Sequence, residues 1–126
     1  MKRLKLTVLQ GEFSVWRLDA DGSQPAIETD TFLSMTRTDD ELSIVSSSSN
    51  VPAGATVETG WRCLRVEGPL SFELTGVIAD LSAPLARAGI PIFVVSTYDT
   101  DYVLVKAVDL EQACSALRDK GHAIDD

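Results

Sequence analysis

The stretch Thr75-Gly-Val-Ile-Ala-Asp-Leu-Ser-Ala-Pro-Leu-Ala-Arg-Ala-Gly-Ile90, continued by Pro91-Ile-Phe-Val-Val-Ser-Thr-Tyr-Asp-Thr-Asp-Tyr-Val-Leu-Val105, decides the fold. Its first part predicts a helix that ends at Gly89, because apolar residues recur there at helical spacing. Pro84 predicts a bend in that helix, or a restart at Ser82. The apolar run 90–96 predicts a central strand buried on both faces. A polar turn over residues 97–100 and a second strand over 101–107 follow.

A second helix and flanking strands complete the pattern around this stretch. Asp109 is the predicted N-cap, Gln112 stands at the capping-box position, and Gly121 ends the helix. We expect a short strand at 122–124 and another over 70–74, ahead of the first helix. The order strand, helix, strand, strand, helix, strand is ferredoxin-like. The sequence therefore predicts an α+β fold with an antiparallel sheet and both helices on one face.

An eleven-residue segment of the first half resembles part of this region. Residues 35–45 align without gaps on residues 95–105, and both segments are typical of a strand, an acidic turn and a strand. Glu41 matches Asp101 in this alignment. The first half otherwise shows strands near 4–10, 13–17 and 57–67, with a polar linker that begins at 46–49. It has loops where helices should be, so we expect a degenerate, helix-poor half at 1–66 and a complete one at 67–126.

Composition limits the classes of function. The 126 residues carry a formal charge of −8, which disfavours nucleic acid as a partner. No apolar run approaches the roughly 20 residues that span a bilayer, and the start lacks a secretion signal, so we expect a cytoplasmic protein without a membrane partner. Cys63 and Cys114 have no metal-ligand spacing and are interpreted as buried thiols. His122, the only histidine, is interpreted as a helix-dipole partner or a surface residue.

Residues 75–90 and 91–105, quoted above, resemble an ACT domain of the small tandem type. This type is related to the regulatory region of aspartate kinases and to the cytosolic arginine sensors of animals. The resemblance is strongest over residues 68–121, and residues 36–45 and 60–62 also resemble the small bacterial members. It implies a regulatory module that binds an amino acid between paired domains.

The resemblance also implies where the ligand lies. In the sensors, the loop entering the first helix and the turn after the second strand hold it. The sequence departs from them at Leu74, where they have an acidic residue, so a preference for a cationic ligand does not carry over. The matching ligand-binding positions here are Thr75, Gly76, Val77, Ile78, Thr97, Tyr98, Thr100 and Asp101.

The residue types give a physical reason for such a site. A helix start presents unpaired N–H groups and a partial positive charge, and Gly76 lets a carboxylate approach them. Asp101 offers an acceptor for an ammonium group. We prefer Asp101 to Asp99 because it stands at the strand edge and because Glu41 keeps the charge in the repeat. The alternatives are that Gly76 only turns the chain and that both aspartates are solvated turn residues.

Three functions remain open from the sequence. The leading hypothesis is a non-catalytic amino-acid sensor, acting as a homodimer in which the Gly76 loop of one unit lies near the Asp101 turn of its neighbour. The alternative is an assembly or scaffold protein of ACT type with no ligand. A small enzyme is the weakest hypothesis, because no catalytic, metal or cofactor site rises above background.

Overall fold

The computed structural model describes residues 3–27 and 31–126, which form two compact units. Met1–Gln10 together with Arg62–Asp126 form the first unit, and Gly11–Trp61 form the second. The chain thus passes between the units twice. This division differs from the predicted boundary between residues 66 and 67, because the start of the chain belongs with the C-terminal residues. Neither helix of the described residues is long and apolar enough to cross a bilayer.

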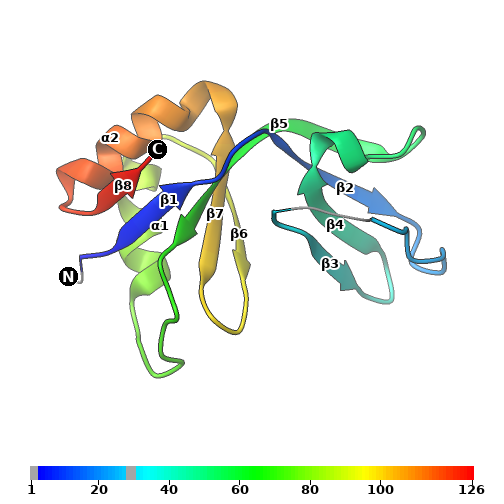
Figure 1. The fold of residues 1–126 in the computed structure, drawn as a ribbon, viewed down its shortest axis with the longest axis horizontal. Coiled ribbons are helices and arrows are strands. Elements are labelled where there is room, and N and C mark those ends of the chain that lie inside the picture. The colour runs from blue at the N-terminus through cyan, green and yellow to red at the C-terminus, as the bar shows by residue number, and fades with distance from the viewer. Residues whose placement is uncertain (1–2, 28–30) are drawn as a thin grey trace. The chain divides into compact units, whose positions relative to one another are not determined.

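The first unit has the predicted order of elements. It contains β1 (Lys5–Val8), the end of β5 (Thr56–Val66), α1 (Val77–Arg87), β6 (Ile92–Ser96), β7 (Asp101–Lys106), the 3-10 turn η2 (Ala107–Asp109), α2 (Leu110–Asp119) and β8 (Ala123–Asp125) (Figure 1). From β5 onwards this is strand, helix, strand, strand, helix, strand, as predicted. The first strand of the series is the end of β5, however, and the strand predicted at 70–74 is wrong. Ser71 holds a turn there instead, because its Oγ accepts from the Glu73 N–H and its carbonyl from the Leu74 N–H.

The sheet of the first unit runs β6-β7-β5-β1-β8. Strand β1 lies between β5 and β8, antiparallel to β5 and parallel to β8, as Figure 1 shows for the blue and red strands. The sheet is therefore not wholly antiparallel. Within the described part of the chain β6 pairs with β7 alone and is half-buried, so the prediction of a doubly buried central strand is wrong. A continuous apolar run does not reveal which strand of a sheet is the outer one.

Both helices of the first unit pack on one core. α1 and α2 contact each other, and their buried faces join those of β1, β5 and β7. The helix α1 runs through Pro84 without the predicted restart. Cys63 and Cys114 are buried as predicted. The buried members of this core are Leu4, Leu6, Leu64, Val66, Val77, Leu81, Leu85, Ile90, Val103, Val105, Ala113, Cys114 and Leu117.

The second unit consists of strands and a 3-10 turn. Its elements are β2 (Phe13–Leu18), β3 (Ser34–Arg37), β4 (Leu42–Ser47), η1 (Ser48–Asn50) and the first part of β5, in the order β3-β4-β2-β5. Its described residues contain no α-helix, which confirms the helix-poor half. Trp16, Leu42 and Ile44 form its core. Ser46 lies in β4 rather than in a linker, and its Oγ accepts a 2.9 Å hydrogen bond from the indole N–H of Trp16.

The two predicted hairpins are present, but their structural alignment differs by one residue from the alignment of their sequences. In each, a threonine begins a four-residue turn. The N–H of Thr38 donates to the Glu41 carbonyl at 2.9 Å, and the N–H of Thr97 donates to the Thr100 carbonyl at 2.8 Å. Glu41 is therefore equivalent to Thr100, whereas the sequence alignment paired it with Asp101. The buried Leu42 takes the place of Asp101 in the second unit, so the acidic partner expected for Asp101 does not exist there.

Candidate functional site

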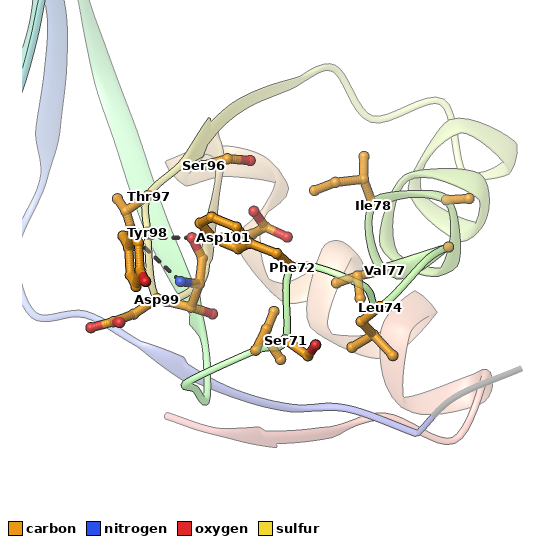
Figure 2. A pocket seen from close by; sticks show the side chains of 14 residues that line it. Ser71, Phe72, Leu74, Val77, Ile78, Ser96, Thr97, Tyr98, Asp99 and Asp101 are labelled. Atoms are coloured by element: carbon orange, nitrogen blue, oxygen red, sulfur yellow. Dashed lines mark hydrogen bonds between the residues drawn. The ribbon is translucent and has the colours of Figure 1, made fainter.

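A pocket of about 430 Å³ opens in the first unit, between the segment that leads into α1 and the turn that joins β6 to β7 (Figure 2). One wall is the loop after β5 with the first turn of α1, and the other is the β6–β7 turn. The lining residues are Leu70, Ser71, Phe72, Leu74, Gly76, Val77, Ile78, Ala79, Ser96, Thr97, Tyr98, Asp99, Thr100 and Asp101.

Short backbone contacts tie the two walls together. The N–H of Leu70 donates to the Asp99 carbonyl at 2.6 Å. The hydroxyl of the buried Thr100 donates to the Val66 carbonyl at 2.7 Å. A Cβ at Gly68 would lie 3.0 Å from the Asp99 oxygen, so glycine permits this close approach. The pocket is therefore framed by hydrogen bonds before any ligand enters.

The turn wall is held by Thr97. Its backbone N–H donates to the Thr100 carbonyl, and its Oγ1 accepts from the Thr100 N–H at 3.3 Å. These hydrogen bonds pair backbone and hydroxyl groups of Thr97 and Thr100 with each other. As a result the two middle residues, Tyr98 and Asp99, are left exposed at the mouth of the pocket.

The helix wall begins at Gly76. This residue is the N-cap of α1, has a left-handed φ of 82°, and its carbonyl accepts the N–H of Asp80 at 2.8 Å. Apart from the adjoining backbone, no heavy atom lies within 4 Å of the place where a Cβ would stand, so the space in front of this residue is open. The first N–H groups of an α-helix have no partner inside the helix. Gly76 thus supplies the backbone conformation and leaves these groups uncovered.

Seven of the eight residues predicted to bind a ligand line this one pocket. They are Gly76, Val77, Ile78, Thr97, Tyr98, Thr100 and Asp101, whereas Thr75 does not line it. One chain brings them together, so the pocket does not require a neighbouring subunit to contribute the turn. Val77 and Thr100 are almost fully buried, so they support the wall of the pocket rather than project into it. That these residues bind a ligand stays a prediction.

The prediction missed the loop that follows β5. Phe72 extends from this loop toward the turn that carries Tyr98 and Asp101 (Figure 2). The rings of Phe72 and Tyr98 have centroids 4.8 Å apart and planes tilted by 58°. Residues 70–74 were interpreted as a strand, which placed Phe72 in a sheet. The signal that could have corrected this is the Gly68-Pro69 pair and Ser71, since all three residue types favour turns.

The charges of the pocket have one sign. Among the described residues that line it, the charged ones are Asp99 and Asp101. Asp101 is half-buried and Asp99 is exposed. The described residues contain no group of three or more histidines, cysteines and acids that could hold a metal ion. The pocket thus has carboxylates on one wall and the start of a helix on the other. The carboxylates suit an ammonium group and the helix start suits a carboxylate, which are the two ends of a zwitterion.

Comparison with known proteins identifies the fold family. A family model described as an ACT domain matches residues 56–119, just over half of the chain. The protein belongs to the ACT-domain family. Its predicted resemblance to this family is confirmed, and the matched range contains the whole pocket. A second model, described as an N-terminal domain, matches residues 11–54, which lie in the second unit.

Individual relatives differ in how much of the chain they share. The human protein named cytosolic arginine sensor for mTORC1 subunit 1 is 30% identical over 95 residues, which cover 69% of this chain and 29% of the sensor. The bovine sensor is 41% identical over 46 residues, 36% of this chain and 14% of the sensor. This ACT-domain chain therefore spans less than a third of the length of these relatives.

Solved structures share the fold over nearly the whole chain. A crystal structure of an Agrobacterium tumefaciens protein is 42% identical with a TM-score of 0.92, and covers 98% of this chain and 93% of that one. The ligand-free regulatory subunit of aspartate kinase from Thermus thermophilus has a TM-score of 0.64 at 11% identity, with coverages of 92% and 97%. At that identity the likeness to the aspartate kinase subunit shows the fold alone.

Proposed function

We propose that this ACT-domain protein is a non-catalytic regulatory module that binds a free amino acid in the pocket between α1 and the β6–β7 turn. The carrying observation is that the helix start at Gly76 and the carboxylate of Asp101 line the same pocket of one chain. The volume of about 430 Å³ suits a small metabolite, since ligand pockets run from roughly 300 to 1,000 Å³. The name of the arginine-sensor relatives supports a ligand of this class.

The proposed binding mode uses the two ends of the zwitterion. The α-carboxylate lies against the uncovered N–H groups at the start of α1, where the helix dipole is positive. The ammonium group is hydrogen-bonded to the Asp101 carboxylate, and such charge-assisted bonds are about twice as strong as neutral ones. The turn residues Thr97, Tyr98 and Thr100, together with the helix residues Val77 and Ile78, surround the ligand. Thr75 is not part of this mode.

A homodimer in the cytoplasm completes the proposal. Strand β6 is an outer strand in the described part of the chain, and outer strands have backbone groups available for pairing with another chain. A two-fold pairing of such strands is a common solution in homo-oligomers. Pairing of this kind would join two ACT domains in one sheet and leave each pocket built by its own chain.

Isothermal titration against the twenty amino acids, arginine included, tests the proposal directly. We expect heat from at least one of them at a protein concentration near one millimolar. Absence of heat with all twenty would contradict amino-acid sensing.

A pair of glycine variants locates the site. Gly76 and Gly89 flank the same helix, have φ values of 82° and 74°, and have open space at the Cβ position. Alanine at either position forces a side chain into the left-handed region, at a cost of about 1 kcal/mol. We expect Gly76→Ala to weaken ligand binding at least tenfold and Gly89→Ala to leave it unchanged, at similar losses of stability. Equal affinities would place the ligand elsewhere.

The second candidate function is an assembly module with no ligand, and the half-buried outer strand β6 favours it. It predicts a concentration-dependent dimer in sedimentation velocity that no amino acid changes. Gly76→Trp, which blocks the helix start, separates the two functions. The sensor loses its ligand in this variant and keeps its oligomeric state, whereas the assembly module has no binding to lose.

A further inference from the structure

Exposed apolar side chains gather at the mouth of the pocket. Among the described residues, six large apolar or aromatic side chains are exposed, and Phe72, Ile78 and Tyr98 all line this one pocket. Phe72 is 74% exposed and Tyr98 is 81% exposed. Apolar surface concentrated in one hollow is typical of a binding site, because burial of such side chains against a ligand removes apolar surface from water.

The aromatic part of this surface is held by contacts within the chain. Phe72 and Tyr98 come from different segments, yet their rings lie 4.8 Å apart between centroids. The segments are joined by the hydrogen bond from the Leu70 N–H to the Asp99 carbonyl, and the Thr97 bonds hold the turn itself. A ligand that contacts both rings therefore meets a surface that is already in place, which reduces the entropic cost of binding.

We propose that the pocket selects α-amino acids with apolar side chains, through a subsite made by Phe72, Tyr98, Leu74 and Ile78. This inference rests on the proposed function, which assigns the ligand's α-carboxylate to the helix start and its ammonium group to Asp101. Beside those two polar regions, these four side chains form the large apolar part of the lining, with the hydroxyls of Ser71 and Ser96 next to it. They supply apolar contacts, and the aromatic pair offers ring faces and edges.

Polar and acidic side chains fit this subsite poorly. A polar group that lies against these four side chains loses hydration without gaining a hydrogen-bonding partner from them. An acidic side chain also adds a negative charge beside Asp99 and Asp101, the charged residues of the described lining. A basic side chain is the closest competitor, because a cation can lie over an aromatic ring. It must, however, place its charge beside Leu74 and Ile78 as well.

Matched amino acids test the selection. L-Norleucine and L-lysine have side chains of equal carbon length and differ by the terminal ammonium group, and L-leucine and L-asparagine have nearly the same shape. We expect titration calorimetry to give norleucine and leucine at least tenfold lower dissociation constants than lysine and asparagine. Tenfold corresponds to 1.4 kcal/mol, about the value of burying one side chain partially.

Variants assign the effect to the subsite. Phe72→Ala weakens norleucine binding about tenfold and leaves glycine binding, which uses only the zwitterion contacts, nearly unchanged. Tyr98→Ala alters a residue of the turn that surrounds every ligand, and it weakens norleucine binding more than glycine binding. Phe72→Leu, which keeps an apolar side chain, retains affinity within a few fold. The control is Val108→Ala, because Val108 is an apolar residue of the same unit that is 92% exposed and lies outside the pocket lining.

The outcomes separate this inference from the proposed function. Tighter binding of lysine, asparagine or aspartate than of their apolar counterparts overturns the apolar subsite and leaves the amino-acid sensor standing. Unchanged norleucine affinity in both alanine variants also overturns the subsite. Absence of heat with every amino acid tested, norleucine included, overturns both proposals.

Discussion

A single histidine compensates for the proline inside α1. Pro84 has no N–H, so residue 84 donates no hydrogen bond to the carbonyl of Asp80. The Nε2 of His122 lies 3.2 Å from that carbonyl, and the Leu4 N–H donates to its Nδ1 at 3.1 Å. In this pattern Nδ1 is the acceptor and Nε2 faces the carbonyl as the donor. His122 is 3% exposed, so the prediction of a surface residue is wrong and its role is to join β1 to α1.

Removal of this ring should destabilise the protein, and by an amount that depends on Pro84. His122→Ala leaves the Leu4 N–H and the Asp80 carbonyl without these partners, and we expect a loss of about 2–4 kcal/mol in urea unfolding. In a Pro84→Ala background residue 84 has an N–H for the Asp80 carbonyl. The histidine substitution should then cost about 1 kcal/mol less.

The exposed neighbour Lys120 supplies the control for this cycle. Lys120→Ala should change stability by less than about 0.5 kcal/mol in either background, because it alters only the surface. Strict additivity of the His122 and Pro84 substitutions would show that the ring does not act through the Asp80 carbonyl.

Cys63 makes the stability sensitive to alkaline pH. Its side chain is 0% exposed, and burial raises the pKa of the thiol from its ordinary 9.0 to about 12. Between these values the unfolded chain loses a proton that the folded chain keeps, so stability falls as the pH rises. We expect a slope of about 1.4 kcal/mol per pH unit from this group above pH 9. Cys63→Ala should remove that contribution in unfolding experiments between pH 9 and 11, and an unchanged slope would contradict it.

At the scale of elements, the two hairpins show one turn used for two purposes. Thr38 and Thr97 make the same hydrogen bonds at the start of their turns. The strand residue that follows the turn is buried Leu42 in one hairpin and half-buried Asp101 in the other. The first hairpin therefore completes a core, whereas the second presents a carboxylate to a pocket.

Valine in place of each threonine should separate stability from binding. Thr97→Val and Thr38→Val both remove the hydroxyl that accepts turn N–H groups, and each should lower stability by about 1 kcal/mol. We expect Thr97→Val alone to weaken binding of the amino acid severalfold, because its turn carries Tyr98 and leads into Asp101. Thermal unfolding and calorimetry on both variants measure the two effects. A binding loss in Thr38→Val would mean that the second unit takes part in the site.

Local sequence patterns predicted most helices and strands correctly, but they did not predict which strands pair with each other in the sheet. The helix ending at Gly89 and the hairpin after it follow from spacing and turn chemistry, which act within a few residues. The outer position of β6 depends on partners far along the chain, so its apolar composition was misleading. In the site, Gly76 and the 97–101 turn could be found from residue types. The Phe72 loop is missed because its strand-like apolar composition outweighs the turn signals of Gly68-Pro69 and Ser71.

At the scale of the whole molecule, the second unit interrupts a hairpin of the first. Strands β1 and β5 pair antiparallel in the first unit, and the Leu9 N–H donates to the Cys63 carbonyl at 2.9 Å. In sequence, the whole of Gly11–Trp61 lies between β1 and the end of β5 that pairs with it. A strand pair that is already in register needs only a short turn to connect it. If that segment is replaced by a short turn, the first unit becomes one continuous chain, and we expect it to fold as an independent domain.

A shortened chain tests this independence. Gln10 joined to Arg62 through Asn-Gly, a pair that favours two-residue hairpins, keeps the register of Leu9 with Cys63. We expect this chain to unfold cooperatively in urea, to give dispersed amide resonances in NMR, and to bind the same amino acid as the full chain. The reason is that the core described above and the whole pocket lie within its residues.

The segment 67–126 alone is the informative comparison, because it is the C-terminal half predicted from the sequence. It lacks β1 and β5, the two strands that separate β7 from β8, and with them the buried side chains of Leu4, Leu6, Leu64 and Val66. Without these two strands, the β6-β7 pair and the strand β8 are no longer joined. Their backbone groups lose hydrogen-bonding partners, and the apolar faces of the helices are exposed to water. We expect this fragment to be unfolded by circular dichroism. A folded fragment would restore the predicted boundary, whereas an unfolded one beside a folded shortened chain would show that the ACT domain needs β1 and the end of β5 together.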